Sequence, residues 1–213
     1  MKLKDIGEFG FIDRISRGCL IRPAGIVKAI GDDAAAFRSE PDLLNLVTTD
    51  LLVERVHFQR DAADGYCLGY KALAVNLSDI AAMGGTARNA FVSNAVPQDV
   101  TLDFLDEFYL GIKSLAAEHE VNILGGDTTG SSVDLVINVV VTGTVAEDEV
   151  LLRDKARVGD IIFSSGCLGD SRAGLHLILN RITADTPYLK NLLGAHLRPK
   201  PFLREGRFLA SHG

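Results

Sequence analysis

The chain has 213 residues and a formal net charge of −6, with 47% hydrophobic and 23% charged residues. This composition is ordinary for a packed globular protein, and it excludes intrinsic disorder and a collagen-like chain. The acidic balance also argues against a protein that binds nucleic acid through the phosphate backbone, because such proteins usually carry a basic face.

The spacing of the cysteines and the composition of the N-terminal residues indicate in which cellular compartment the protein is located. Cys19, Cys67 and Cys167 are scattered, without a CxxC pair or a His at metal-ligand spacing. We therefore expect neither a disulfide framework nor a zinc site, and we interpret Cys19 as a small buried apolar residue. Acidic residues interrupt the N-terminal stretch MKLKDIGEFGFIDRI, and no apolar run reaches the roughly 18 residues of a membrane span. These features predict a cytoplasmic protein with no membrane partner.

The first part of the chain alternates between strand-like and helix-like patterns. Strands are predicted where β-branched or apolar residues run between turn residues, and helices where apolar residues recur at helical spacing. In chain order the pattern predicts a strand at Leu43–Thr49, a helix at Asp64–Met83, a strand at Ala90–Val96, a helix at Thr101–Glu120, and strands at Val121–Leu124 and Val133–Val145.

Both predicted helices show an apolar stripe and a signal at one end. In the first helix, Leu73, Leu77 and Ile80 lie on one side, and a Gly-Gly pair follows the last turn. In the second helix, Thr101 is a candidate N-cap. The apolar stripe of this second helix consists of Leu105, Phe108, Ile112 and Leu115.

A second unit is predicted to begin near Val150, after an acidic turn. Its pattern predicts a strand at Asp160–Ser165, a helix at Ser171–Arg181 and the beginning of a helix within Pro201–Gly213. One strand and two helices are too few to bury a core. We therefore divide the chain into an N-terminal domain, residues 1–149, and the start of a C-terminal domain, residues 150–213, and expect a truncated form of a longer protein.

Five aspartates interrupt or terminate apolar elements, and none has a Lys or Arg within two residues. Each alone is more typical of a turn or a cap, except Asp79, which lies inside an apolar helix where Asp is disfavoured. If the five converge, mutual repulsion would raise their pKa values unless a cation lies between them. They are Asp32, Asp33, Asp50, Asp79 and Asp127.

The neighbours of these aspartates favour a magnesium and phosphate site. Thr48 and Thr49 precede Asp50, and two further threonines follow Asp127. Carboxylate and hydroxyl oxygens without soft ligands suit Mg²⁺, which is commonly shared with substrate phosphates. Glycines before Asp32 and Asp127 allow close approach of main chain to phosphate. These parts predict phosphoryl transfer, but no Walker A, HRD or DFG motif is present, so P-loop and protein-kinase folds are excluded.

Five segments carry a resemblance to a known family. They are, in chain order, IGDDAA, TTDLLVERVHF, YKALAVNLSDIAAMGG, ILGGDTT and GCLGDSRAG. Together they resemble bacterial thiamine-monophosphate kinases along almost the whole chain. The same superfamily contains aminoimidazole ribonucleotide synthetase and selenophosphate synthetase, whose counterparts of the GGDTT segment differ. The resemblance implies an enzyme that uses ATP and several Mg²⁺ ions to phosphorylate thiamine monophosphate to the diphosphate.

The resemblance also implies roles for individual residues. Tyr109, Gly126, Asp127 and Arg153 would contact ATP, and His57 would contact thiamine monophosphate. Without the resemblance, an isolated His, a Tyr on an amphipathic helix and a linker Arg are also compatible with structural roles. The implied magnesium ligands are Asp33, Thr48, Thr49, Asp50, Asp79 and Asp127.

The implied architecture is α/β (α+β). An N-terminal domain with a four-stranded mixed sheet and flanking helices would pair with its twin across a two-fold axis into a dimeric barrel, followed by an incomplete C-terminal α/β domain. Two motifs of the family, DxSDG and GGEDY, do not occur before the chain stops at Gly213. The implied partners are ATP, thiamine monophosphate and a second copy of the chain.

The implied mechanism is direct in-line attack by the acceptor phosphate on ATP, without a general base, because the attacking oxygen is already anionic. Two alternatives stay open. One is another ATP-using member of the superfamily, and the other is a non-catalytic metal- or nucleotide-binding protein on the same scaffold. An ATPase assay with and without thiamine monophosphate distinguishes these alternatives.

Overall fold

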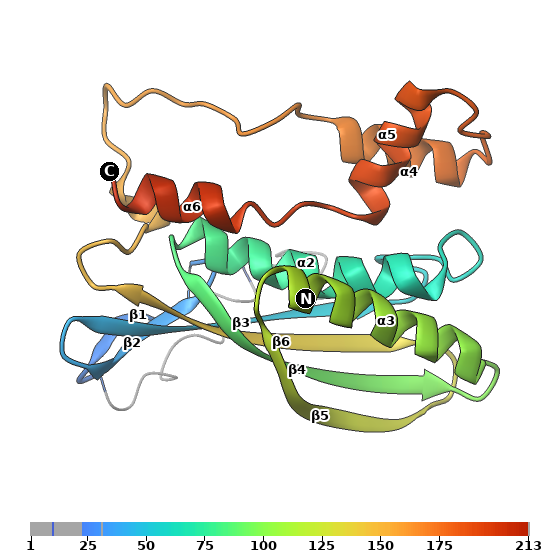
Figure 1. Ribbon diagram of the computed structural model, residues 1–213, viewed down its shortest axis with the longest axis horizontal. Coiled ribbons are helices and arrows are strands. Elements are labelled where there is room, and N and C mark those ends of the chain that lie inside the picture. The colour runs from blue at the N-terminus through green and yellow to red at the C-terminus, as the bar shows by residue number, and fades with distance from the viewer. Residues whose placement is uncertain (1–9, 11–22, 31, 213) are drawn as a thin grey trace.

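The fold is a mixed sheet covered on one face by helices (Figure 1), seen in a computed structural model that describes residue 10, residues 23–30 and residues 32–212. Within these residues one six-stranded sheet has the order β1-β2-β3-β6-β4-β5. Strands β4 and β5 are parallel, and every other neighbouring pair is antiparallel. The strands are β1 (Ile26–Lys28), β2 (Ala35–Glu40), β3 (Leu43–Val53), β4 (Thr86–Pro97), β5 (Asn122–Ser131) and β6 (Val136–Ala146).

All four strands predicted for the first part of the chain are present, and the sheet is mixed. It contains six strands, however, and not the expected four. The additional strands, β1 and β2, precede β3 and pair at its free edge. β1 has three residues and β2 ends in the polar sequence RSE, so neither shows an apolar run that predicts a strand. β2 pairs antiparallel with the long strand β3, and β1 pairs antiparallel with β2, so hydrogen bonds to a neighbouring strand stabilise both short segments.

Two helices, α2 (Gly65–Ala82) and α3 (Leu102–Glu118), cover one face of the sheet (Figure 1). The predicted cap at Thr101 is confirmed, because its hydroxyl oxygen accepts a hydrogen bond from the Phe104 N–H at 3.2 Å. The two helices touch through their backbones at Gly69, where a Cβ atom would lie 1.9 Å from the carbonyl oxygen of Phe108. Only glycine permits this close approach.

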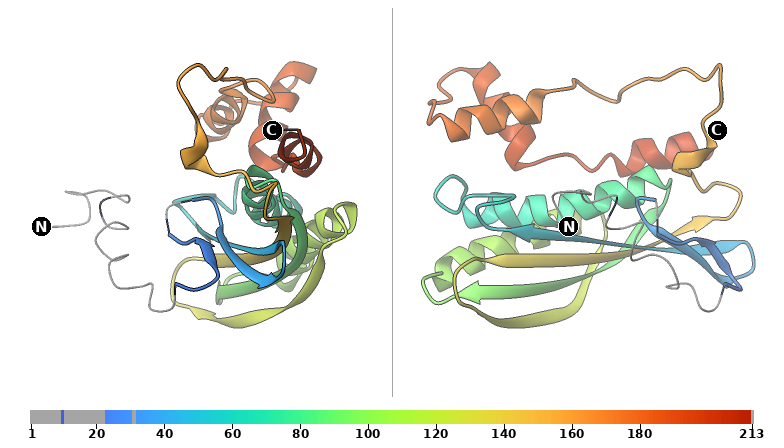
Figure 2. Two further views of the ribbon diagram at one scale, coloured as in Figure 1. Left: turned by 90° about the vertical axis from the view of Figure 1, so that its left-hand side faces the viewer. Right: turned by 180° about the vertical axis from the view of Figure 1, so that it is seen from behind.

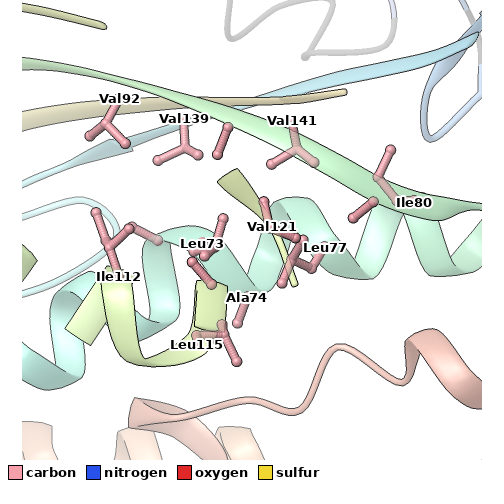
Figure 3. Close-up of a cluster of buried hydrophobic side chains, with 14 of the residues drawn as sticks. Leu73, Ala74, Leu77, Ile80, Val92, Ile112, Leu115, Val121, Val139 and Val141 are labelled. Atoms are coloured by element: carbon pink, nitrogen blue, oxygen red, sulfur yellow. The ribbon is translucent and has the colours of Figure 1, made fainter. Parts of the chain in front are cut away.

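The hydrophobic core lies between these helices and the sheet. Leu73, Leu77 and Ile80 of α2 are fully buried, as their spacing predicts. Figure 3 shows them facing Val139 and Val141 on the sheet. Every second residue of β6 is buried on this helix face. The opposite face, called the open face below, is covered by no helix or strand among the described residues (Figure 2).

The segment after β6 differs most from the prediction. The predicted helix at Ser171–Arg181 is confirmed as α4 (Asp170–Leu179), and the helix predicted to begin within Pro201–Gly213 is α6 (Leu203–Ala210). Helix α5 (Pro187–Leu197) was missed, although Thr186 caps it and proline occupies its first turn, which are recognisable start signals. A short 3₁₀ turn, η1 (Arg153–Lys155), precedes them.

The predicted strand at Asp160–Ser165 is wrong. These residues lie outside any named strand, and Ile161, Ile162 and Phe163 are 87%, 97% and 70% exposed. Their β-branched and aromatic composition favours a strand, but a strand also needs a neighbour to pair with, and the described residues provide none here.

Helix α6 returns to the first part of the chain and packs on α2 (Figure 2). Leu203 at its start is buried in the same core as the α2 residues. Among the described cysteines, Cys67 and Cys167 are free, and Cys19 lies outside the described residues. In the part of the chain that the structure covers, no helix combines the length and apolarity that crossing a membrane requires.

Candidate functional site

Strand β3 and helix α2 bring together three of the predicted magnesium ligands. Thr48 and Asp50 lie on the helix face of β3, since they alternate with exposed Thr49. The Thr48 hydroxyl donates a hydrogen bond to Oδ2 of Asp79 on α2, at 2.5 Å. Asn76, one turn earlier on α2 and fully buried, accepts a hydrogen bond from the Asp50 N–H at 3.0 Å. We call Thr48, Asp50 and Asp79 the helix-face cluster.

Burial makes the two carboxylates of this cluster harder to ionise. It raises the pKa of Asp79 from 3.8 to about 6, despite the Thr48 hydrogen bond, and the negative charges of Asp50 and Asp33 add to the rise. Burial also raises the pKa of Asp50, opposed by the nearby His57. The protein therefore holds carboxylates close enough to repel one another in a partly dry site, an arrangement that a cation stabilises.

Two basic residues, Lys28 and Arg153, pair with the neighbouring carboxylates of Asp32 and Asp33. The guanidinium of Arg153 donates a hydrogen bond to Asp33, and the backbone N–H of Arg153 donates one to Oδ2 of Asp32 at 3.3 Å. Lys28 lies 3.2 Å from Asp32 and 2.9 Å from Asp154. Arg153 is 120 residues from Asp33, so local sequence could not show this partner, whereas Lys28 lies four residues before Asp32. Arg153, predicted to neutralise an ATP phosphate, thus pairs with a predicted magnesium ligand.

The sheet separates two further predicted ligands, Thr49 and Asp127, from the helix-face cluster. On β4, Asn94 is buried on the helix face and lies opposite Thr128 of β5. The preceding residues, Ser93 and Asp127, lie opposite each other. Because side chains alternate along strands, Asp127 lies on the open face. Thr49 also faces this side, where its hydroxyl oxygen accepts a hydrogen bond from Asn138 at 2.9 Å. Strands β6 and β4 separate β3 from β5, which places Asp127 roughly 14 Å from Asp50 across the sheet at about 4.8 Å per strand.

Of the predicted nucleotide residues, Gly126 directly precedes Asp127 on β5, whereas Tyr109 lies on α3, on the helix face of the sheet. The Tyr109 hydroxyl oxygen accepts a hydrogen bond from Nδ2 of Asn94 at 3.0 Å, and Asn94 pairs with Thr128 of β5. Gly126 has φ of 152°, and a Cβ atom there would lie 1.7 Å from the carbonyl oxygen of Val92. The GGDTT segment can therefore pair with β4 only because a glycine occupies this position.

His57 lies just after β3, near the helix-face cluster. Its Nδ1 accepts a hydrogen bond from the Val53 N–H at 3.0 Å. That bond leaves Nε2 to carry the proton of a neutral ring and to face other groups. The position is compatible with the predicted contact to an acceptor.

The oxygen donors on the helix face fit an Mg²⁺ ion that is bound jointly by the protein and by substrate phosphates. In the described part of the chain, no three His, Cys, Asp or Glu side chains stand close enough to hold one metal. Mg²⁺ needs fewer protein ligands, because it keeps several waters and is commonly bound by one or two carboxylates plus substrate phosphates. Asp50, Asp79 and the Thr48 hydroxyl provide that donor set, and the raised pKa of Asp79 favours a cation beside it.

Sequence reasoning missed the asparagines that support these groups. Asn76 orients Asp50, Asn94 orients Tyr109, and Asn138 donates to both Thr49 and the Asp50 carbonyl oxygen, at 2.9 and 3.3 Å. One signal was available: Asn76 is a polar residue within an apolar helix stripe, and a buried amide usually has a hydrogen-bonding task.

Known proteins match both this sequence and this fold. Residues 31–145 match the family described as AIR synthase related protein, N-terminal domain. The chain belongs to this family. Among its relatives is the thiamine-monophosphate kinase of Aquifex aeolicus, 39% identical over 199 residues, which covers 93% of this chain and 61% of the relative. The Bacillus subtilis thiamine-monophosphate kinase is 36% identical over 202 residues, covering 94% and 62%.

A solved structure described as AaThiL complexed with AMPPCP and TMP is similar over 99% of this chain and 64% of its own, with a TM-score of 0.89 and 36% identity. The resemblance found from the five sequence segments is therefore confirmed. This AIR-synthase-related chain spans about 61% of the length of the curated relatives it matches.

Proposed function

We propose that this protein transfers the γ-phosphoryl group of ATP to thiamine monophosphate, forming thiamine diphosphate and ADP. The observation that carries the proposal is the similarity of the whole chain to a structure complexed with AMPPCP and TMP. The helix-face cluster and the GGDTT segment on β5 supply the oxygen donors and the close main-chain approach that phosphoryl transfer uses.

In the proposed reaction, an oxygen of the acceptor phosphate forms a bond to the γ-phosphorus while the bond to the β–γ bridging oxygen breaks. Thr48, Asp50 and Asp79, with Asp33 nearby, would hold Mg²⁺ on the helix face, and Thr49 and Asp127 would hold it on the open face. Mg²⁺ offsets repulsion between phosphates, about 4 kcal/mol for unit charges 4 Å apart at an effective dielectric of 20.

The remaining residues bind and orient the substrates. Gly126, next to Asp127, and Tyr109, on the helix face, would contact ATP, and His57 would contact the acceptor. A cation at Asp33 competes with the Arg153 guanidinium and frees it for a phosphate of ATP. We assign these roles to an N-terminal domain of residues 1–149, with residues 150–213 beginning a second domain, although α6 packs on the first.

Variants of the full-length enzyme test the assignment. His57→Ala is expected to raise KM for thiamine monophosphate at least about tenfold with Mg-ATP binding nearly unchanged, because it removes an acceptor contact. Asp127→Asn is expected to lower kcat by orders of magnitude at saturating acceptor, since it removes a metal ligand. Steady-state kinetics and nucleotide titration measure both. Loss of nucleotide binding in His57→Ala, or faster turnover of an aminoimidazole or selenium substrate, would refute the assignment.

We also propose that the open face pairs with a second copy of the chain. Leu51, Phe91 and Leu124 lie on or beside this face and are 52%, 38% and 59% exposed. Light scattering is expected to report about twice the chain mass at micromolar concentration, and Phe91→Glu is expected to yield monomers. Leu110→Glu, on the exposed side of α3, is the control and should remain dimeric. A monomeric wild-type protein contradicts the proposal.

A further inference from the structure

The segment that follows β3 forms a tight turn that carries His57. The His57 N–H and the Val56 N–H both donate to the Val53 carbonyl oxygen, at 2.9 and 3.2 Å. The Val53 N–H in turn donates to Nδ1 of the His57 ring at 3.0 Å. Because the ring is bonded to the backbone of its own turn, the direction of the ring depends on the shape of that turn.

One residue of this turn has an unfavourable backbone conformation. Arg55 has a φ of 65°, in the left-handed region that costs free energy for residues other than glycine. Such a conformation persists only where the surrounding contacts impose it. The Arg55 N–H donates to the Phe58 carbonyl oxygen at 2.7 Å, and its guanidinium pairs with Asp134, also at 2.7 Å. The turn is therefore held by its own hydrogen bonds and by a contact outside it.

A second ion pair connects the turn to two neighbouring loops. The carboxylate of buried Glu54 accepts hydrogen bonds from the Leu135 N–H, just before β6, at 2.9 Å and from Nε of Arg60 at 2.7 Å. Nη2 of Arg60 donates to Asp99, just after β4, at 2.8 Å. The loops that follow β3 and β4 and the start of β6 lie at one end of the sheet (Figure 1). Glu54 and Arg60 therefore join the His57 turn to both other segments.

We propose that Glu54 and Arg60 are positioning residues that hold this turn so that Nε2 of His57 faces the acceptor. The inference rests on the proposed contact of His57 with thiamine monophosphate and adds the residues that keep the ring in place. A side chain that is already ordered loses less conformational freedom when it binds a ligand. A fixed turn therefore favours binding of the acceptor rather than the phosphoryl-transfer step itself.

Steady-state kinetics of the full-length enzyme test this role. Arg60→Ala leaves the buried Glu54 carboxylate without a cation and loosens the turn. It is expected to raise KM for thiamine monophosphate about three- to tenfold, with kcat and Mg-ATP binding changed less than about twofold, because the metal site stays intact. Arg60→Lys, which can still pair with Glu54, should restore most of the affinity. If Arg60 acts through His57, the double variant His57→Ala/Arg60→Ala should have the KM of His57→Ala alone.

A measurement without substrate tests the structural step separately. In protein with isotope-labelled histidines, the chemical shifts of the ring nitrogens report which nitrogen of His57 carries the proton, and His57→Ala identifies the signal. The wild type should show one ordered ring with Nδ1 as an acceptor, and Arg60→Ala should shift or broaden that signal. Glu54→Gln is a milder change that can still accept from the Leu135 N–H, and it should have a smaller effect of the same kind.

Arg38→Ala is the matched control. Arg38 also forms an ion pair, with Nε 2.8 Å from a carboxylate oxygen of Glu147, but it lies beside the start of β3, at the opposite end of that strand from the His57 turn. This variant should keep the KM and the His57 signal of the wild type. Circular dichroism verifies that each variant is folded.

Two sets of outcomes separate this inference from the proposed function. An unchanged KM or an unchanged His57 ring signal in Arg60→Ala overturns the inference, and so do effects of His57→Ala and Arg60→Ala on KM that simply add. An unchanged KM in His57→Ala refutes instead the acceptor role of His57, and the ring signal then still decides whether Glu54 and Arg60 hold the turn.

Discussion

Asp79→Asn is expected to stabilise the protein without metal and to reduce its stabilisation by Mg²⁺. In the folded chain the pKa of Asp79 is raised from 3.8 to about 6. A raised carboxyl pKa opposes folding, with a penalty that is absent below about pH 4, grows up to about pH 6 and stays constant above it. The penalty is on the order of 1–2 kcal/mol, after discounting for the half-exposed carboxyl. Asparagine removes it and can still accept the Thr48 hydrogen bond.

Urea unfolding at pH 5 and pH 8, with and without millimolar Mg²⁺, measures this effect. The wild type should gain stability with Mg²⁺, and more with ATP present, because a ligand that binds only the folded state stabilises it by mass action. Asp79→Asn should be more stable than the metal-free wild type at pH 8 and should gain less stability from Mg²⁺ than the wild type does. Asp106→Asn, an exposed position on α3, is the control and should behave like the wild type. An unchanged Mg²⁺ response in Asp79→Asn would remove this residue from the metal site.

Gly126→Ala is expected to cost about 2–4 kcal/mol of stability, a large part of the roughly 5–15 kcal/mol typical of a domain. The added Cβ atom would lie 1.7 Å from the Val92 carbonyl oxygen, and the φ of 152° is unfavourable for alanine. Relief requires β5 to move away from β4, which also displaces Asp127 and the predicted nucleotide contacts.

Denaturant titration measures the loss, and Gly130→Ala provides the matched control on the same strand. A Cβ atom at Gly130 has no heavy atom within 4 Å, so this variant should change stability by less than about 0.5 kcal/mol. If Gly126→Ala is as stable as Gly130→Ala, the close approach of β5 to Val92 is not needed for folding.

Local patterns predicted most of the regular elements correctly. The capping hydroxyl of Thr101 and the buried stripe of α2 involve residues only three or four positions apart, so their physics is visible in the sequence. The short strands β1 and β2 were missed because their stability comes from pairing with a neighbouring strand, β2 with β3 and β1 with β2, rather than from their own composition. The prediction of a strand at residues 160–165 was wrong for the opposite reason. These residues have a strand-like composition, but no neighbouring strand among the described residues pairs with them.

The sequence predicted which side chains supply oxygen donors to the candidate site, but not how these side chains are arranged in space. Oxygen donors beside glycines indicated phosphate and Mg²⁺ because ligand type follows from residue chemistry. The division of those donors between two faces of the sheet was invisible, since a shift of one residue in strand register reverses the face of every side chain. Only the observed register places Thr48 and Asp50 beside α2 and Asp127 on the open face.

The sequence by itself determined the boundaries of α2 and α3 to within two residues, the donor chemistry and the family, because each depends on residue types within short segments. The tertiary structure alone decided the strand order, the return of α6 to α2 and the partners of the charges. Arg153 and Asp33 are 120 residues apart in the chain, and Lys71 and His196 are 125 apart. No local pattern encodes such contacts, because they form only after the whole chain has buried its core.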